Sequence, residues 1–445
     1  MVGRLRPTQI RRPPIMTTFD TICAPITAPG GAVSIIRLSG PEAWEVAAST
    51  FKNFPSQPES HRAYYGQFSN GDDGLVLVFA KGHSYTGEES AEFNTHGSPA
   101  SVATLIALLE RNGARLARPG EFTERAFLNG RLDLSQAEAV NDTVRAMTDR
   151  QLSLANELRE GGLRSAITGA SEFLISALAA IEASVDFSEE IGEVDPILLQ
   201  QRINQASEIL TPLIINGHEG RFIREGIRIA IVGPPNAGKS SLLNRILGVN
   251  RVIVTDVAGT TRDYVEETCI LGGLQCNLID TAGLRESDDK VESLGIQRAR
   301  AIAAKADLIW YVFDASIGLS EVDQNELAQF SASVVLIANK ADLGESTVGI
   351  PISTYTGTGI DQLVMQLKKW SGDVSGIVPN RRHVEHLQSA VNSLSAVTDG
   401  INANHPPDLL VTHLRSALHE LGLITGETAD QDLLQRIFRD FCIGK

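Results

Sequence analysis

The sequence predicts a multidomain protein: an N-terminal α+β domain, an α-helical domain, and a doubly wound α/β domain inserted into the helical one. Short runs of alternating apolar and polar residues fill the first part of the chain, and amphipathic helical patterns flank its middle. Between those patterns, a strand, a glycine-rich loop and a helix follow one another around residue 233. At 445 residues the chain has room for about three domains of ~150 residues each.

Composition indicates a soluble protein in a reducing compartment. No apolar run approaches the ~18 to 20 residues that span a bilayer, and the N-terminus lacks the apolar centre of a secretory signal. We therefore expect a cytoplasmic protein with no membrane partner. The net charge of −15 argues against a broad, non-specific attraction to nucleic acid, so we expect any RNA contact to be local or shared with a partner. The cysteines have no spacing typical of zinc or of a disulfide framework: Cys23, Cys269, Cys276 and Cys442.

Residues 1–16 are expected to form a disordered extension. Their four arginines and lack of acids superficially fit an organellar transit peptide, but three prolines oppose the amphipathic helix that such a peptide uses.

Residues 17–133 predict a small α+β domain, with strands near 32–38 and 75–79 and a helix at 99–110. The stretch 118–131 crowds charged and apolar side chains without clear periodicity. On the residues alone, it fits a packed loop with internal salt bridges better than a functional site.

Two other features of this domain suggest chemistry only weakly. His83 and His96 are spaced too irregularly to predict a metal site. The segment 71–74, Gly-Asp-Asp-Gly, formally matches the GxxG loop of KH RNA-binding modules, but its two aspartates would repel a phosphate backbone. We therefore interpret it as a turn.

Residues 134–222 and 375–445 predict the helical domain. Ala137, Val140, Val144 and Met147 recur at helical spacing, and residues 173–181 repeat the pattern. Thr428 to Gln431 predicts a capping box before the last helix. One helical domain interrupted by an insertion explains this order more simply than two separate bundles.

Residues 223–374 predict the inserted domain. Apolar strands are expected at 227–232, 274–279, 308–313 and 334–338 with helices between them, which is the alternation of a doubly wound sheet.

The segment 233–240, Gly-Pro-Pro-Asn-Ala-Gly-Lys-Ser, predicts a phosphate loop. Its glycines let backbone N–H groups turn towards a polyphosphate, Lys239 would reach the outer phosphates, and the Ser240 hydroxyl can ligate Mg²⁺. The alternative is an ordinary glycine-rich turn, which the strand before it and the helix after it disfavour.

Further polar segments follow the later strands at the spacing of a GTP site. Asp280 to Gly283 would serve Mg²⁺ and the γ-phosphate, while Asp342 in 339–342, Asn-Lys-Ala-Asp, can accept from two guanine N–H groups that adenine lacks. Ser353-Thr354-Tyr355 is expected to close over the base. The combination predicts a Ras-like α/β P-loop GTPase domain.

Between these segments, 260–263, Thr-Thr-Arg-Asp, is either a nucleotide switch or a polar turn. Leu284 stands where Ras-type enzymes have a water-orienting glutamine, so another group must position the nucleophile. Glu292 is the best carboxylate for this, with a solvated acid at a helix start as the equal alternative. Asn236 could place its carbonyl oxygen on a monovalent cation.

Taken together, three of these motifs and the C-terminal Cys-Ile-Gly-Lys resemble the MnmE (TrmE) family of tRNA-modification GTPases. The motifs are Gly-x-Pro-Asn-Ala-Gly-Lys-Ser, Ala-Gly-Thr-Thr-Arg-Asp and Asp-Thr-Ala-Gly-Leu-Arg-Glu, which also occur in ribosome-assembly GTPases such as Era and Der. The C-terminal tetrapeptide, the stretch 118–134 and the domain order are more specific, and the resemblance covers the chain from about residue 16 to its end.

The resemblance implies a homodimer whose N-terminal domains bind tetrahydrofolate and whose GTPase domains dimerise when K⁺ and GTP are bound. With an FAD-containing partner of the MnmG (GidA) family, such proteins add an aminomethyl or carboxymethylaminomethyl group to C5 of the wobble uridine, position 34, of certain tRNAs. The carbon comes from 5-formyl- or 5,10-methylene-tetrahydrofolate.

Matching motifs carry the family's functional residues to this chain. Glu292 corresponds to the catalytic glutamate. K⁺ would be held by Asn236, Thr255, Val257 and Thr260, and Mg²⁺ by Ser240 and Thr261. Folate would be bound by Arg37, Glu92, Arg131 and Lys445, with arginine at 131 where many members have lysine. The GTP contacts would be Asn236, Ala237, Gly238, Lys239, Ser240, Ser241, Thr255, Thr260, Thr261, Asp280, Gly283, Asn339, Lys340, Asp342, Ser353, Thr354 and Tyr355.

Some assignments stay open at the level of sequence. Ser353-Thr354-Tyr355 replaces the family's usual Ser-Ala-Lys, so the side chain that stacks on guanine is undecided. Cys442 is either a functional thiol or a buried small hydrophobe. The rival functions are a ribosome-assembly switch that binds rRNA without folate chemistry, and a folate-dependent transferase whose GTPase domain is only regulatory.

Overall fold

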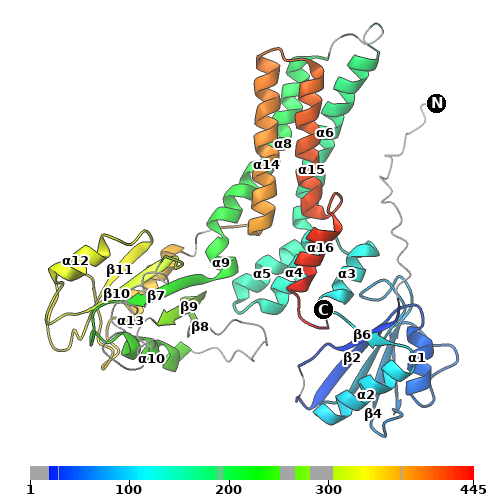
Figure 1. Cartoon of the computed structure of the whole chain (residues 1–445), viewed down its shortest axis with the longest axis horizontal. Coiled ribbons are helices and arrows are strands. Elements are labelled where there is room, and N and C mark those ends of the chain that lie inside the picture. Colours follow the sequence, from blue (N-terminus) through cyan, green and yellow to red (C-terminus); the bar gives the residue numbers. More distant parts are fainter. Residues whose placement is uncertain are drawn as a thin grey trace. The chain divides into compact units, whose positions relative to one another are not determined.

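The computed structural model describes two compact units (Figure 1). One unit comprises the chain up to residue 144 together with 158–210 and 385–445, and the other comprises 145–157 and 211–384. The predicted extension 1–16 lies outside the described residues, which are 20–28, 30–187, 189, 192, 194–250, 266–280, 304–370, 372 and 374–444.

The N-terminal part of the first unit is a six-stranded sheet with the order β3-β4-β5-β2-β1-β6. All neighbouring strands are antiparallel except β1 and β6. The strands are β1 Ile22–Pro25, β2 Val33–Ser39, β3 Arg62–Gln67, β4 Asp73–Phe79, β5 Ser90–His96 and β6 Arg115–Leu116, and two helices accompany them, α1 Ala43–Thr50 and α2 Pro99–Arg111. The α+β prediction is therefore confirmed, including the helix at 99–110.

One face of this sheet forms the domain core. Alternate strand residues such as Ile36, Val76 and Phe93 are fully buried and pack with Val46 of α1 and Leu105 of α2. The intervening residues point to the opposite face, which leaves polar side chains of β2 and β5 available for a site.

The stretch 118–131 is a helix, α3 Glu121–Leu128, and our prediction of a loop there was wrong. Gly120 begins the helix in the left-handed conformation, two acids occupy its first turn, and Arg125 lies in its last turn, which suits the helix dipole. The apolar periodicity is hidden because charged residues are buried among the apolar ones. The predicted internal salt bridges are present, from Arg118 to Glu121 and Glu124 and from Arg125 to Glu121.

Four long helices of the first unit form a bundle, visible in Figure 1 as α6, α8, α14 and α15. Polar contacts join each helix to the next: Arg202 to Ser176 O, Gln200 to Thr398, His386 to Glu420 and Arg415 to Glu182. The two helical segments that flank the insertion thus pack as one bundle. The helices of this part of the chain are α4 Leu134–Arg145, α5 Asp149–Arg159, α6 Gly162–Asp186, α8 Pro196–Glu219, α14 Arg381–Asn402, α15 Pro407–Thr425 and α16 Gln431–Arg439.

Two details of this region differ from the sequence expectations. The N-cap of α16 is Asp430, whose carboxylate accepts from Leu433 N, so the capping box from Thr428 to Gln431 was wrong. In addition, α6 is long and apolar enough to span a membrane by length and composition. One such helix is weak support for a membrane span, because a core helix passes the same test, and Ile167, Leu174 and Ile181 of α6 are buried.

The second unit contains a six-stranded sheet with the order β12-β11-β10-β7-β9-β8. Every neighbouring pair is parallel except β8 and β9, so β8 is an antiparallel edge strand that the sequence analysis missed. The strands are β7 Ile227–Val232, β8 Glu266–Leu271, β9 Leu274–Asp280, β10 Leu308–Asp314, β11 Ser333–Asn339 and β12 Ile350–Pro351. The helices are α9 Arg221–Glu225, α10 Lys239–Asn250, α12 Glu321–Leu327, α13 Ile360–Leu367 and the 3₁₀ helix Lys368–Trp370.

Most of α5, up to Glu157, belongs to this second unit. Leu154 is buried in the core cluster of its sheet, and Arg150 donates to the carbonyl oxygens of Gly372 and Val374. Gln151 donates to Arg224 O and to the Gln275 side chain at the start of β9. The boundaries predicted at 222/223 and 374/375 stay predictions, and the compact units do not follow them.

Candidate functional site

The phosphate loop connects β7 to α10 in the predicted order of strand, loop and helix. A Cβ at Gly233 would come within 2.0 Å of Val312 O, and a Cβ at Gly238 within 2.1 Å of the Asn339 side-chain nitrogen. Both glycines also have positive φ, 142° and 93°. Because no other residue fits at either position, the loop keeps the open backbone that a polyphosphate needs.

Lys239 is directed into this loop. Its Nζ donates to the carbonyl oxygens of Gly233 and Pro234, at 2.8 Å each. The ammonium group is therefore held where the outer phosphates of a bound nucleotide would lie. Ser240 is exposed at the same helix start, and its hydroxyl is the oxygen donor that Mg²⁺ prefers.

Asn339 joins the phosphate loop to the segment 353–355, which was predicted to close over the base. Its side-chain nitrogen donates to Ala237 O at 2.8 Å, and its side-chain oxygen accepts from Thr354 N at 3.2 Å. Because Asn339 is fully buried, both bonds are protected from water. The structure thus brings together two predicted segments that lie about a hundred residues apart in the chain.

The other predicted base contacts surround this link. The Lys340 ammonium is held by the Asp314 carboxylate at 2.6 Å, and hydrogen bonds from Lys340 and Ser316 lower the pKa of Asp314. Asp342 is exposed and Ser353 is buried, while Tyr355 is 87% exposed, so its ring is available to a base. The sequence analysis missed Asp314, although an acid at the end of a buried strand was a usable signal.

Several predicted residues cannot be placed. Asp280 ends β9 beside Ile231 of β7, at the carboxyl edge of the sheet, and its side chain is not described. The remaining ones lie outside the described residues: Thr255, Val257, Thr260, Thr261, Gly283 and Glu292. Asn236, by contrast, is exposed in the phosphate loop with φ 61°, consistent with a polar ligand position.

A second candidate site lies on the polar face of the N-terminal sheet. Arg37 of β2 and Glu92 of β5 are register partners, and both Nε and Nη2 of Arg37 contact Glu92 Oε1 at 2.9 Å. The two side chains are only 12% and 18% exposed, so the ion pair is held in place and part of it remains accessible to a ligand. Arg131 lies after α3 and donates to Gly82 O at 3.1 Å, in the loop that leads from β4 to β5.

The C-terminal segment reaches the same sheet. Cys442 O accepts from Gly120 N at 3.3 Å, and a Cβ at Gly444 would come within 2.4 Å of Pro25 O. Pro25 is one residue from Ala24, the register partner of Arg37. Lys445 itself lies outside the described residues, and the Cys442 thiol is half-buried.

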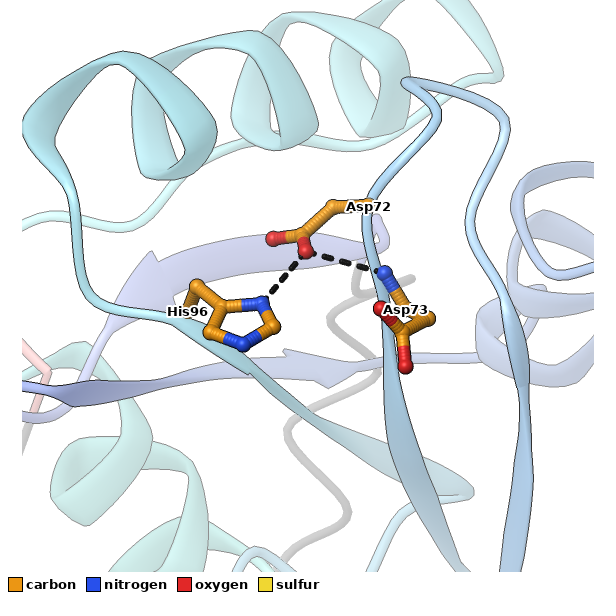
Figure 2. A group of neighbouring side chains, drawn as sticks. All are labelled: Asp72, Asp73 and His96. Atoms are coloured by element: carbon orange, nitrogen blue, oxygen red, sulfur yellow. Dashed lines mark hydrogen bonds and ion pairs between the residues drawn. The ribbon is translucent and has the colours of Figure 1, made fainter.

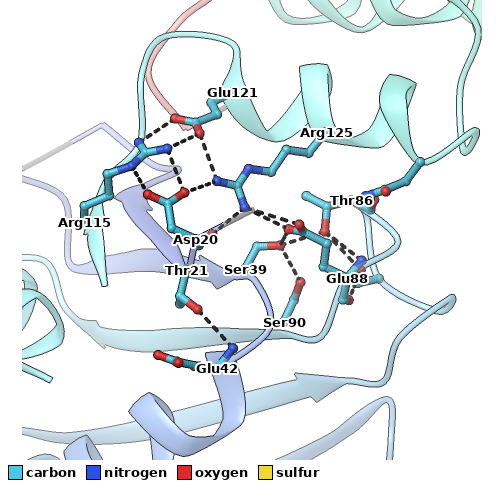
Figure 3. Close-up of polar contacts among 12 residues, drawn as sticks. Asp20, Thr21, Ser39, Glu42, Thr86, Glu88, Ser90, Arg115, Glu121 and Arg125 are labelled. Carbon is cyan, nitrogen blue, oxygen red and sulfur yellow. Dashed lines mark hydrogen bonds and ion pairs between the residues drawn. The ribbon is translucent and has the colours of Figure 1, made fainter. Parts of the chain in front are cut away.

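A charge network centred on the buried Arg125 and Glu121 holds α3 on this sheet (Figure 3). Arg125 is 1% exposed and pairs with Asp20, Glu88 and Glu121, and Arg115 also contacts Asp20 and Glu121. Burial opposes ionisation of Glu121, but hydrogen bonds from Arg115, the Arg118 backbone and Arg125 lower its pKa to about 2. The sequence analysis predicted salt bridges within 118–131 but missed the more distant partners Asp20, Glu88 and Arg115, because no local pattern brings them together.

The structure also gathers Asp72, Asp73 and His96, which the sequence analysis had treated separately (Figure 2). Their ligand atoms are close enough to share a cation. However, both Asp72 oxygens are already engaged, by His96 at 2.6 Å, Asp73 N at 2.9 Å, and the hydroxyls of Thr95 and Ser101 at 2.6 and 2.5 Å. These bonds join the start of β4, the end of β5 and the first turn of α2. We call the bonded pair of Asp72 and His96 the Asp72–His96 clasp.

Comparisons with known proteins identify the family of the chain. The family model described as MnmE helical domain matches residues 134–442, and the one described as GTP-binding protein TrmE N-terminus matches residues 21–131. The tRNA modification GTPase MnmE of Moorella thermoacetica is 41% identical, over 96% of this chain and 99% of that protein. The tRNA modification GTPase MnmE of Streptococcus pyogenes serotype M1 is 39% identical, over 97% of this chain and 100% of that protein.

Solved structures match shorter parts of the chain. Era of Aquifex aeolicus is 26% identical and covers 38% of this chain and 66% of its own, with a TM-score of 0.27. The G domain of T. maritima FeoB is 24% identical and covers 33% of this chain and 99% of its own, with a TM-score of 0.25. The assignment therefore comes from the family models and the full-length relatives: the chain belongs to the MnmE family of tRNA modification GTPases.

Proposed function

We propose that this chain is a K⁺-activated GTPase that acts with an FAD-containing MnmG-type partner on the wobble uridine of certain tRNAs. Together they install the aminomethyl or carboxymethylaminomethyl group at C5. Family membership makes the chain a GTP hydrolase of tRNA modification. The observation that carries the finer proposal is a phosphate loop tied to a base loop by Asn339, in one chain with the Arg37–Glu92 pair.

In the GTPase unit, each described residue has a role set by its position. The loop N–H groups and Lys239 bind the phosphates, and Asn339 keeps the phosphate and base loops in register. Asp342 would select guanine, and the exposed ring of Tyr355 can stack on it.

Two cations would complete the nucleotide site. Mg²⁺ held by Ser240 and Thr261 would neutralise phosphate charge, and K⁺ held by Asn236, Thr255, Val257 and Thr260 would supply the positive charge of an arginine finger. Exposure of Asn236 and Ser240 on the loop supports both assignments. Glu292 would orient the attacking water.

The N-terminal sheet would bind the one-carbon donor, 5-formyl- or 5,10-methylene-tetrahydrofolate. Such a ligand carries carboxylates and a ring edge rich in N–H groups, which suit an arginine and a glutamate respectively. Arg37, Glu92, Arg131 and Lys445 would bind it. The approach of Gly444 to Pro25 supports this, because it brings the C-terminal segment to the strand that pairs with Arg37.

We also propose that two copies of the chain assemble through the N-terminal sheet. Tyr65, Leu75, Asn94 and Ile35 are register neighbours across four strands, on the face opposite the helices. Tyr65 and Leu75 are 73% and 40% exposed, and a mainly apolar row on an open sheet face is suited to a second copy. The GTPase units would dimerise separately when K⁺ and GTP are bound.

GTP hydrolysis by the purified protein in matched KCl and NaCl tests the proposal. We expect strong stimulation by K⁺, and its loss in Glu292→Ala and in Asn236→Ala. The exposed Asn244→Ala on α10 is the matched control and should hydrolyse GTP like the unaltered protein. Equal rates in both salts would reject the cation site and favour a switch with an external activator.

A further inference from the structure

We infer that Tyr85 is a positioning residue of the candidate folate site and acts by holding the Arg37 guanidinium through its ring. This inference rests on the proposed folate function. It adds a side chain that neither the motifs nor the family resemblance pointed to.

The contacts of Arg37 define the role. Glu92 fixes one edge of its guanidinium at 2.9 Å. The guanidinium carbon lies 4.9 Å from the centre of the Tyr85 ring and 5.6 Å from that of Phe122, both within the range of a cation–π interaction. A guanidinium held by one carboxylate and two rings keeps a single orientation and presents its remaining N–H donors to a ligand.

Tyr85 is itself anchored. Its hydroxyl shares a 2.8 Å hydrogen bond with the hydroxyl of Thr123, which is fully buried on α3. Burial raises the pKa of Tyr85, so the ring stays a neutral phenol. The chain therefore carries a continuous series of contacts from α3 through Thr123 and Tyr85 to Arg37.

The loop that carries Tyr85 is fastened to α3 and the segment after it at three more points. Asn129 donates to Thr86 O at 2.8 Å, Arg125 pairs with Glu88, and Arg131 donates to Gly82 O. Figure 3 shows Thr86 and Glu88 beside Arg125. Arg131 is itself a predicted folate contact, so the loop 80–89 contacts two arginines of the site, Arg37 through Tyr85 and Arg131 through Gly82. Several independent contacts therefore fix the position of Tyr85.

The test is a titration of the full chain with 5-formyl-tetrahydrofolate by calorimetry. Tyr85→Leu should weaken binding about 5- to 30-fold, the range expected for loss of a partly desolvated cation–π contact. Tyr85→Phe keeps the ring and should stay within about 3-fold, because only the bond to Thr123 is lost. Tyr64→Leu is the matched control, since Tyr64 also stacks on an arginine, Arg62 at 5.8 Å, on strand β3.

A double-mutant cycle separates positioning from a general loss of structure. In an Arg37→Ala background, Tyr85→Leu should have no further effect on folate affinity, because the group it positions is gone. GTP hydrolysis by Tyr85→Leu should match that of the unaltered chain, because the residues of the nucleotide site belong to the other unit. Additive losses, or full affinity in Tyr85→Leu when Arg37→Ala binds poorly, would overturn the role of Tyr85 alone. Failure of the unaltered protein to bind the folate would overturn the proposed folate function as well.

Discussion

At the scale of single residues, Asn339 links the two loops of the candidate nucleotide site. It is fully buried and bonded to two loops. Asn339→Ala should remove the side-chain bonds to Ala237 O and Thr354 N, and the free energy of nucleotide binding should weaken by about 2 kcal/mol. Because 1.4 kcal/mol is a tenfold change, GDP affinity measured with a fluorescent analogue should fall roughly 30-fold. Unchanged affinity would show that the two loops hold their positions without this link.

The Asp72–His96 clasp predicts a pH dependence of stability. The hydrogen bond between His96 and Asp72 raises the pKa of His96. A raised histidine pKa stabilises the fold below the unfolded value of about 6.5, and this contribution is lost as pH rises through the folded value. The unfolding free energy of the unaltered chain should therefore fall from pH 6 to pH 8 relative to that of His96→Asn. Urea unfolding across this range measures it, and a constant difference would contradict the clasp.

At the scale of elements, α3 is held on the sheet by charge and should be sensitive to acid. The pKa of Glu121 falls from 4.5 to about 2 in the folded chain. A lowered carboxyl pKa stabilises the fold above pH 4.5, and the contribution, about 3 kcal/mol, is lost as pH falls towards 2. Glu121→Gln should abolish this part of the acid dependence in denaturant titrations of the first unit. Parallel acid profiles for the two proteins would mean that other carboxyls control it.

The same helix shows why local sequence patterns failed there. Residues 118–131 have no clean apolar stripe, because Glu121 and Arg125 are buried next to Phe122 and Phe127. A charged side chain can be buried on a helix only when oppositely charged partners reach it. Here the partners from other elements are Asp20, Glu88 and Arg115. The helix was therefore predictable only with knowledge of its tertiary neighbours.

At the scale of the whole molecule, the second unit includes a helical segment from outside the predicted insertion, most of α5. Gln151 is 7% exposed, and its amide bonds Arg224 O, Gln275 and the backbone of Met147 and Thr148. Gln151→Ala should lower the unfolding free energy of the second unit by about 1 to 3 kcal/mol. We expect a lower thermal transition for the unit that GDP stabilises, with the other transition unchanged. The exposed Ser153→Ala on the same helix is the control, and a shift of both transitions would contradict the assignment.

The sequence by itself determined the three kinds of domain, the strands of the inserted sheet and the nucleotide motifs. These features are local: strand and helix periods, glycines at a phosphate loop, and a polar segment directly after a buried strand. Such signals need no distant partner, so the predictions for β7, β9, β10 and β11 agree with the structure.

Only the tertiary structure decided which distant residues meet. It paired Arg37 with Glu92 and placed the Tyr85 ring against the Arg37 guanidinium. It also brought the C-terminal segment to Pro25. In addition, it placed most of α5 in the second unit, where Gln151 contacts Gln275. These contacts follow from strand register and side-chain packing between segments that lie far apart in the chain, and no local pattern encodes them.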